Sequence, residues 1–190
     1  MAGLRSVVAA FALLFAGAAA AVADEAGWAA LARPGTAALM RHAEAPGIGD
    51  PPAFRLGDCA TQRNLSEDGR RQARAIGAAL RSRGIIFDRV LSSAWCRCAE
   101  TAELLALGPV EPLPALNSLF RNADRAEAQT SELRTFLAER AGGEKLMLVT
   151  HQRNIAALTG AGAASGEIVV VAIGAGGKVV VRGRIEAPRP

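Results

Sequence analysis

The chain has 190 residues, a formal net charge of +4, and a composition that is 51% hydrophobic but only 4% aromatic. This length predicts a single domain with a core of its own. The positive charge comes almost entirely from arginine, without a long basic run and without interleaved aromatic residues. Such a pattern argues against nucleic acid as a partner and favours small anionic ligands.

The first 23 residues have the pattern of a secretory signal peptide. Arg5 supplies a positive start, an apolar stretch spans 7–15, and Ala21-Val22-Ala23 offers a small-residue cleavage site. We therefore predict a signal peptide over 1–23, one domain over 24–190, and a periplasmic or secreted protein without a membrane anchor after cleavage. The alternative is an uncleaved anchor, but the alanine-rich run is marginal for a bilayer span.

Export makes the three cysteines informative. In an oxidising compartment Cys59 is expected to pair with Cys96 or Cys98, leaving one thiol over. Cys96 and Cys98 are too close in sequence to pair comfortably with each other in a helix. A zinc site is the competing interpretation, but a C-x-C pair with one distant cysteine and no nearby histidine fits it poorly. We expect no metal and no cofactor.

In chain order, the first half predicts a helix over 24–33, a strand over 36–40 and a long Gly/Pro-rich loop over 46–61. Ser66 is a good N-cap for the following helix, which runs to about Arg83 and stops at Gly84. A strand over 85–91 and a helix over 95–107 follow.

The second half predicts a short strand over 110–113, an irregular segment over 116–129 and a helix over 130–141. A strand over 145–150 and a helix over 152–158 come next, and strands over 167–173 and 178–185 form a terminal hairpin around the glycines of 174–177. Strands that alternate with helices indicate a three-layer α/β/α domain around a central, mostly parallel sheet.

The chain contains two histidines, and both directly follow the carboxyl end of a predicted strand. Arg41 and His42 follow the strand over 36–40, and His151 follows the strand over 145–150. Ligands of open α/β sheets bind at this edge of the sheet. Arg97, in the first turn after another strand end, can point into the same crevice. The alternatives are packed or solvated histidines and a solvated helix arginine.

Four stretches, in the right order over 39–158, carry motifs that resemble those of one family. They are Leu39–Glu44 for R-H-G-E, with Ala43 in place of glycine; Leu65–Gly69 for L-[ST]-x-x-G; Ser92–Ala102 for S-S-P-x-x-R-x-x-x-T-A, with Ala94 in place of proline; and Val149–His151 for V-[ST]-H-G. The sequence thus resembles the histidine phosphatase (phosphoglycerate mutase-like) superfamily. Its layout is similar to that of exported lipopolysaccharide-core heptose phosphate phosphatases.

The resemblance implies hydrolysis of a phosphomonoester or phosphoramidate without a metal. Neutral His42 would attack phosphorus to give a phosphohistidine, which water then hydrolyses. Arg41, Arg97 and His151 would provide the positive surroundings that phosphoryl transfer needs. The implied partner is a small phosphorylated substrate, with an envelope phosphosugar as one candidate.

Three positions depart from the family pattern. Ser118 occupies the place where mutases and many phosphatases carry a glutamate that donates a proton, Ile48 replaces an asparagine, and Gln152 replaces a glycine. These changes argue against a mutase. Phosphohistidine phosphatases also lack the acid, because their leaving group needs little protonation. Asp58, Glu44 and Asp124 are the candidates to replace it.

Further candidates are Arg63 and Arg55, in the loop expected over the site, and Gln152. We expect Arg63 and Gln152 to contact substrate, with a solvated side chain as the alternative for each arginine. Two rival functions remain open. One is a non-catalytic envelope protein that holds a phosphorylated ligand in the same Arg/His pocket, and the other is a structural envelope protein without phosphate affinity.

Overall fold

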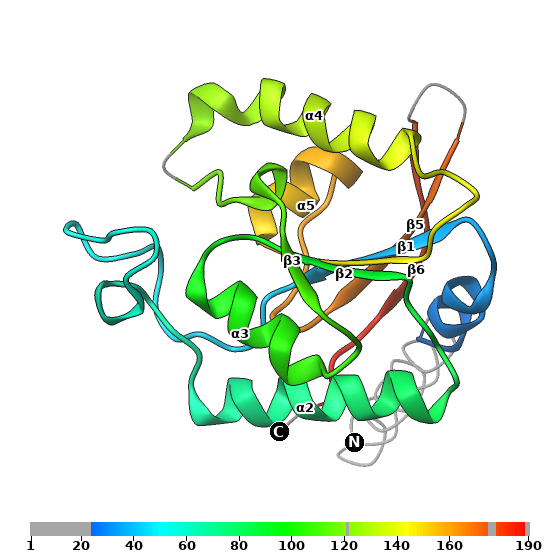
Figure 1. Ribbon diagram of the computed structural model, residues 1–190, viewed down its shortest axis with the longest axis horizontal. Helices are drawn as coiled ribbons and strands as arrows, with labels where there is room; N and C mark the ends of the chain where they lie inside the picture. The colour runs from blue at the N-terminus through cyan, green and yellow to red at the C-terminus, as the bar shows by residue number, and fades with distance from the viewer. Residues whose placement is uncertain (1–23, 121, 175–177, 189–190) are drawn as a thin grey trace, which may run out of the picture.

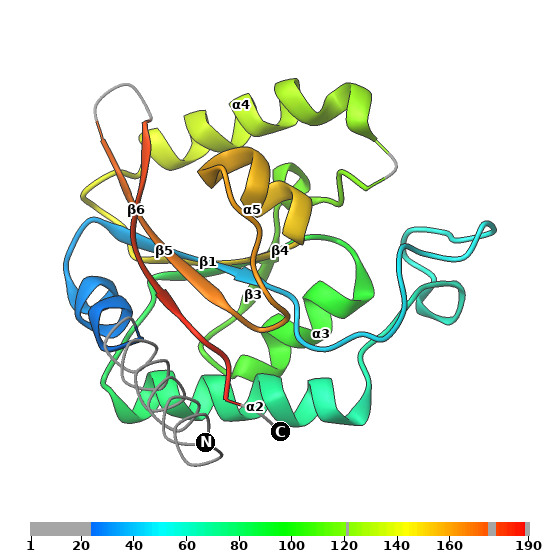
Figure 2. The same ribbon diagram turned by 180° about the vertical axis from the view of Figure 1, so that it is seen from behind.

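A sheet with the strand order β3-β2-β4-β1-β5-β6 runs through the middle of the computed structural model, which describes residues 24–120, 122–174 and 178–188 (Figures 1 and 2). Among the described strands, β5 runs in the opposite direction to the other five. It therefore pairs antiparallel with β1 and with β6, and the remaining pairs are parallel. The strands are β1 (Thr36–Arg41), β2 (Arg89–Ser92), β3 (Val110–Pro112), β4 (Leu146–Thr150), β5 (Ile168–Ile173) and β6 (Val179–Ile185).

Helices cover both faces of the sheet (Figure 1). Helices α2 (Glu67–Ser82) and α3 (Cys96–Leu105) lie on one face, together with a helix over 24–32. Helices α4 (Ala126–Ala138) and α5 (Gln152–Thr159) lie on the other. Three short 3₁₀ turns, Cys59–Thr61, Pro114–Leu116 and Ala123–Arg125, lie in the connections.

The two hydrophobic cores follow from the alternation of side chains along each strand. In β1, Ala38 and Met40 pack in the core beneath α2 and α3, whereas Leu39 packs in the core beneath α4 and α5. The residues of β4 divide in the same way, with Met147 in the first core and Leu148 in the second. The three-layer α/β/α architecture predicted from the sequence is therefore confirmed.

Some boundaries differ from the prediction. The second strand begins at Arg89 and not at 85, because Ile86 is 79% exposed in the connection that leaves α2. Helix α4 begins at Ala126, four residues early, since its first turn is built from good helix formers that we assigned to an irregular segment. The predicted signal peptide over 1–23 and hairpin turn over 175–177 lie outside the described residues.

The loop between β1 and α2 projects from the body of the domain, on the left in Figure 1, and a disulfide fastens it there. The bond joins Cys59 to Cys96, the first residue of α3, while Cys98 is free and buried. This resolves the two pairings that the sequence left open. Over the described ranges, no three His, Cys, Asp or Glu side chains gather as a metal site requires. None of the described helices is long and apolar enough to span a bilayer.

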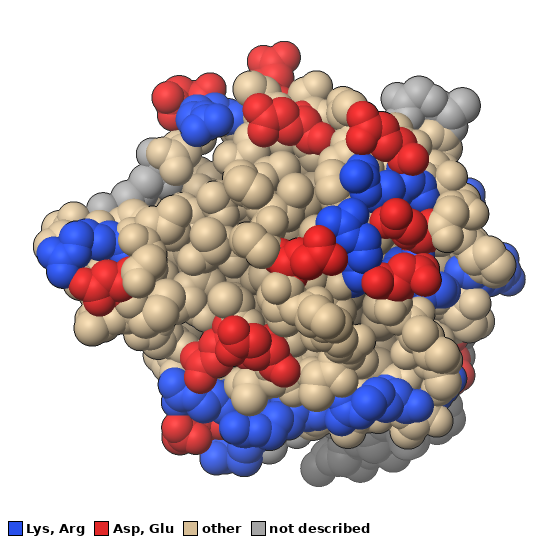
Figure 3. Space-filling model, viewed as in Figure 1, with Lys and Arg blue, Asp and Glu red and all other residues tan. Residues whose placement is uncertain are grey.

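Positive charge on the surface gathers along α2, at the lower edge of Figure 3. Much of this charge is already neutralised. Arg70 is paired with Glu67 and Glu100, and Arg71 is paired with Asp68. The basic excess of the sequence therefore does not give α2 a continuous row of free cations.

Helices α2 and α3 approach each other closely at Gly77. A Cβ at this position would lie 2.0 Å from the carbonyl oxygen of Leu105, which is backbone and cannot rotate away. Glycine is normally unfavourable in a helix by about 1 kcal/mol relative to alanine. Its presence in the middle of α2 is explained by this contact.

We expect Gly77→Ala to destabilise the protein by about 1–3 kcal/mol, because the cost of overpacking exceeds the gain in helix propensity. Chemical denaturation monitored by circular dichroism measures this change. Gly143→Ala is the matched control, since an added Cβ there meets no atom closer than 3.9 Å. Equal stability of the two variants would show that α2 and α3 can separate without cost.

Candidate active site

The pairing of β1 with β4 brings the two histidines together. The strands are parallel with Arg41 opposite Thr150, so the residue that follows each strand end is a histidine. The His42 backbone N–H donates to the Thr150 carbonyl at 3.0 Å, and the two imidazole rings meet edge to face with centroids 5.6 Å apart. This geometry agrees with the expectation from the sequence that His42 and His151 lie at the same edge of the sheet.

The His42 imidazole is neutral and its tautomer is fixed. Its Nδ1 lies 2.8 Å from the carbonyl oxygen of Ala43, which can only accept, so Nδ1 carries the hydrogen. The lone pair is then on Nε2. The ring is buried, and this desolvation lowers the pKa of His42 to about 3, with the charges of Arg97, Arg63 and Arg41 acting in the same direction. A neutral imidazole with a free Nε2 is a competent nucleophile.

His151 is also neutral, for a similar reason. Burial lowers its pKa well below the usual value, and His42 and three arginines add to the effect. Its Nδ1 faces Arg97 Nη2 at 3.5 Å, and a guanidinium can only donate. The hydrogen is therefore on Nε2, which donates to Ser93 Oγ at 2.9 Å, and that hydroxyl donates in turn to Asn117 Oδ1 at 3.3 Å.

Arg41 and Arg63 are held by backbone carbonyls. Arg41 donates to the Ala163 carbonyl at 3.0 Å, and Arg63 donates to the Gly49 carbonyl at 2.7 Å and to that of Ala45. Burial lowers the pKa of both guanidinium groups. The Nε atoms of Arg41 and Arg97 are buried without a hydrogen-bond partner. Buried donors are rarely left unpaired, and a bound oxyanion would satisfy donors of this kind.

Arg97 forms a buried ion pair with Asp50 from the projecting loop. Two bonds of 2.7 and 3.2 Å join the groups, and the side chains are 3% and 8% exposed. Asp50 also accepts from Trp95 Nε1 at 3.1 Å and from the Arg63 backbone at 3.2 Å. Burial opposes ionisation, but the bonds and charge of Arg97 outweigh it and hold the pKa of Asp50 below its usual value. No sequence pattern pointed to this residue, which lies in an irregular loop.

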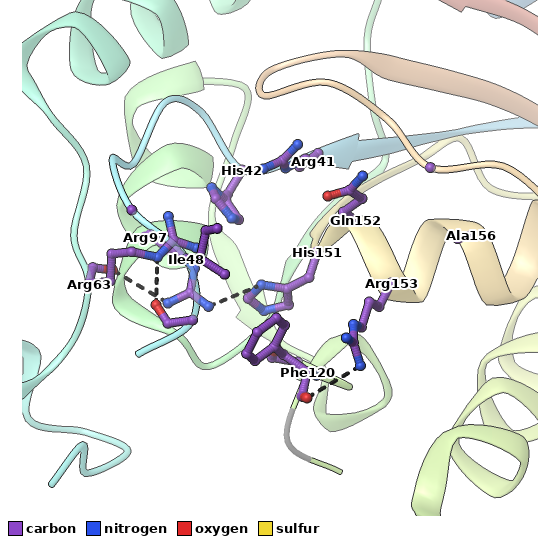
Figure 4. Close-up of a pocket in the computed structure, with 14 residues that line it drawn as sticks. Arg41, His42, Ile48, Arg63, Arg97, Phe120, His151, Gln152, Arg153 and Ala156 are labelled. Carbon is purple, nitrogen blue, oxygen red and sulfur yellow. Dashed lines mark hydrogen bonds between the residues drawn. The ribbon is translucent and has the colours of Figure 1, made fainter. Parts of the chain in front are cut away.

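These side chains surround a cavity of about 410 Å³ (Figure 4). Its lining includes every site residue that we predicted: Arg41, His42, Arg63, Arg97, His151 and Gln152. Ile48 and Ser118, two of the departures from the family pattern, also line it. Within the described part of the chain the lining contains no carboxylate. The cavity is thus suited to an anion.

The candidate replacement acids lie elsewhere. Asp58 is bonded to Arg55 at 2.6 Å in the projecting loop, so neither residue reaches the cavity. Asp124 is exposed and Glu44 does not line the cavity either. Asp50 is the carboxylate beside the arginines, but it is ionised in its ion pair and has no proton to donate. Ser118, at the position expected for the acid, is buried at 5% exposure.

Several motif residues support the site without facing it. The Ala43 backbone N–H donates to Thr101 Oγ1 at 3.1 Å, which fixes the chain beside His42. Ser66 caps α2 by accepting from Gly69. A Cβ at Gly69 would lie 2.0 Å from the Glu44 carbonyl, so glycine lets α2 approach this segment. The roles of Thr101 and Asn117 were not predicted from the sequence, because they depend on contacts between distant elements.

Comparisons with known proteins agree with this site. Residues 38–122 match the model of the histidine phosphatase superfamily (branch 1). This span contains most of β1, the projecting loop, α2 and α3, and hence His42, Arg63 and Arg97. No curated protein matches the sequence.

Solved structures share the fold at low sequence identity. The protein histidine phosphatase SixA, complexed with tungstate, is 17% identical with a TM-score of 0.57, and the match covers 80% of this chain and 96% of that one. YhfR of Bacillus stearothermophilus is 18% identical with a TM-score of 0.58, and the match covers 78% of this chain and 95% of that one. Phosphoserine phosphatase of Entamoeba histolytica, complexed with 3-phosphoglyceric acid, is 13% identical with a TM-score of 0.57. The match covers 80% of this chain and 96% of that one.

The family match begins within β1, which ends at Arg41 just before His42, and the solved phosphatases share the fold of the sheet that brings these residues beside His151. Residues 38–122 thus resemble the histidine phosphatase superfamily, the chain shares the fold of solved phosphatases, and together these findings support a phosphatase enzyme.

Proposed function

We propose that the protein hydrolyses a phosphomonoester or phosphoramidate through a phosphohistidine at His42, without a metal ion. The observation that carries the proposal is the state of His42. Its Nδ1 hydrogen is bound to the Ala43 carbonyl, and its ring lines a cavity among guanidinium groups. A neutral nucleophile beside an anion-binding surface is what attack on a phosphate requires.

In the first step, the lone pair of His42 Nε2 attacks phosphorus, and the bond to the leaving group breaks with its electron pair going to that group. In the second, water attacks phosphorus, the P–N bond breaks, Nε2 recovers its lone pair, and the protons of water leave with the inorganic phosphate. Arg41, Arg63 and Arg97 stabilise the charge on the phosphoryl oxygens in both steps. Since His151 is neutral here, the guanidinium groups supply the positive charge.

The surroundings of the leaving group support a restricted choice of substrates. Ser118 lines the cavity where a glutamate would protonate the departing oxygen, and no described carboxylate lines it. We therefore propose substrates whose leaving group departs easily, such as a phosphoramidate or a phosphosugar of the cell envelope with an anomeric phosphate. The solved neighbour named a protein histidine phosphatase supports the phosphoramidate alternative.

We also propose export. The signal-like segment over 1–23 and the Cys59–Cys96 disulfide support it, since such bonds persist in oxidising compartments. Bacterial cells that produce the full chain should release from the periplasm a protein that begins at Asp24 and carries this disulfide. Mass spectrometry of the fractions measures both features. A cytoplasmic product with its first 23 residues and three free thiols would contradict export.

We expect His42→Ala to abolish turnover and phosphoenzyme formation, because it removes the attacking atom. The measurement is trapping of label from a ³²P-labelled aryl phosphate by rapid quenching in an alkaline denaturant, because the P–N bond of a phosphohistidine is stable in alkali and hydrolyses in acid. Arg55→Ala is the control and should retain both signals, since Arg55 lies on the projecting loop away from the cavity. A wild-type protein that binds phosphate but never acquires label would instead be a non-catalytic binder. A wild-type protein that does not bind phosphate would fit the structural alternative.

The wild-type rate should fall steeply as the leaving-group pKa rises, because a well-placed general acid contributes about 10²–10⁴-fold and no described carboxylate lines the cavity. The test compares kcat/KM for a series of aryl and alkyl phosphates at fixed pH. Ser118→Glu should flatten the dependence, and Ser118→Gln, which has no proton of suitable pKa, should not. Alkyl esters cleaved by wild type nearly as fast as aryl esters would show that another group donates the proton.

A further inference from the structure

One cation of the cavity has no place in the chemistry above. Arg153, in the first turn of α5, lines the outer part of the cavity (Figure 4). Its guanidinium lies 4.6 Å from the centroid of the Phe120 ring and donates to the Phe120 carbonyl at 3.4 Å. No described carboxylate lies within ion-pair distance of it. Several other surface arginines have acidic partners, namely Arg70, Arg71, Arg83, Arg89, Arg140 and Arg184; among the cavity-lining arginines, Arg153 is the one whose chain position and exposure place it at the outer side.

The charge of the inner cavity is balanced without Arg153. Arg41, Arg63 and Arg97 contribute three positive charges, and Asp50 on Arg97 removes one. Glu44 and Glu167 act on Arg41 from outside the lining, so the two positive charges that remain among these side chains match the two negative charges of a phosphate dianion. Arg153 is therefore a cation that the phosphate does not require, and its charge is available to another anionic group.

The side chains near Arg153 leave room for a substrate and offer it an apolar surface. Ile48 is 89% exposed and Phe120 is 41% exposed, although both line the cavity. Ala156 and Gly162 complete this part of the lining with little or no side chain. Exposed apolar side chains that gather at the mouth of a polar cavity are typical of a ligand contact.

We propose that the outer part of the cavity binds a second anionic group of the substrate. Arg153 would hold this group, and Ile48 and Phe120 would contact the apolar part that joins it to the phosphate. This inference rests on the proposed function. It narrows the substrates to phosphorylated molecules that carry a carboxylate or a second phosphate beyond the scissile one.

Binding of three non-hydrolysable probes to the wild-type protein tests the proposal. They are 4-methylbenzylphosphonate and the 3- and 4-carboxymethyl analogues, which differ in the second anion and its position. Titration calorimetry measures Kd for each. We expect at least one carboxymethyl probe to bind about two- to fivefold more tightly than the methyl probe, the range of an exposed ion pair. The preference should weaken as salt is added.

Three variants locate the effect. Arg153→Gln should abolish the preference, and Arg153→Lys should retain part of it because the charge remains. Arg74→Gln is the matched control, since Arg74 is an exposed arginine on α2 outside the cavity, and it should keep the full preference. Equal binding of all three probes to wild type, or an undiminished preference in Arg153→Gln, would overturn the proposal.

Hydrolysis of the corresponding aryl phosphates separates this proposal from the proposed function. Tight binding of a carboxymethyl probe without any turnover would retain the second anion site and reject the phosphatase mechanism. Turnover of all the aryl phosphates at the same rate, without a preference for a carboxymethyl group, would retain the phosphatase mechanism and reject the second anion site. Failure of every phosphonate to bind would overturn both, because each inference requires that the cavity hold a phosphoryl group.

Discussion

The parallel pairing of β1 with β4 is the constraint on which the site depends. With Arg41 opposite Thr150, the next residue of each strand is a histidine, so one register fixes both imidazole rings. A shift of one residue would turn every side chain of β1 to the opposite face. The apolar alternation of Ala38, Leu39 and Met40 between two cores prevents that shift. The stability of the sheet and the geometry of the nucleophile therefore have the same origin.

The positive charge of the cavity resides on its arginines, and one carboxylate, Asp50, neutralises part of it. Arginine stays ionised when buried, whereas histidine loses its proton, so the same environment gives charged guanidinium groups and neutral imidazoles. Asp50 restrains Arg97 by two hydrogen bonds and neutralises part of the surplus. Without it, three guanidinium groups would face one another with no described carboxylate among the lining residues. The loop that carries Asp50 is thus part of the electrostatic design of the site.

Sequence patterns predicted the three layers and the strand ends, because periodicity and strand-end position are local properties. The six residues predicted for the site all line the cavity, and their roles stay predictions. The contacts made by Asp50, Thr101 and Asn117 were not predictable, since each joins segments that are distant in sequence. The predicted start of α4 was wrong because no capping residue marks the true start at Ala126. The choice between Cys96 and Cys98 needed three dimensions, because both belong to the same helix and differ only in the direction they face.

The projecting loop is pinned at two points, by Asp50 on Arg97 and by Cys59 on Cys96. The eight intervening positions, 51–58, form a closed excursion whose ends are held independently of its length. The entropy of closing such an excursion grows only slowly with added residues. Insertions or exchanges between the two attachment points would therefore leave the phosphate-binding residues in place, since no residue of 51–58 lines the cavity. This segment is therefore a place where a foreign sequence can be inserted without moving the residues of the cavity.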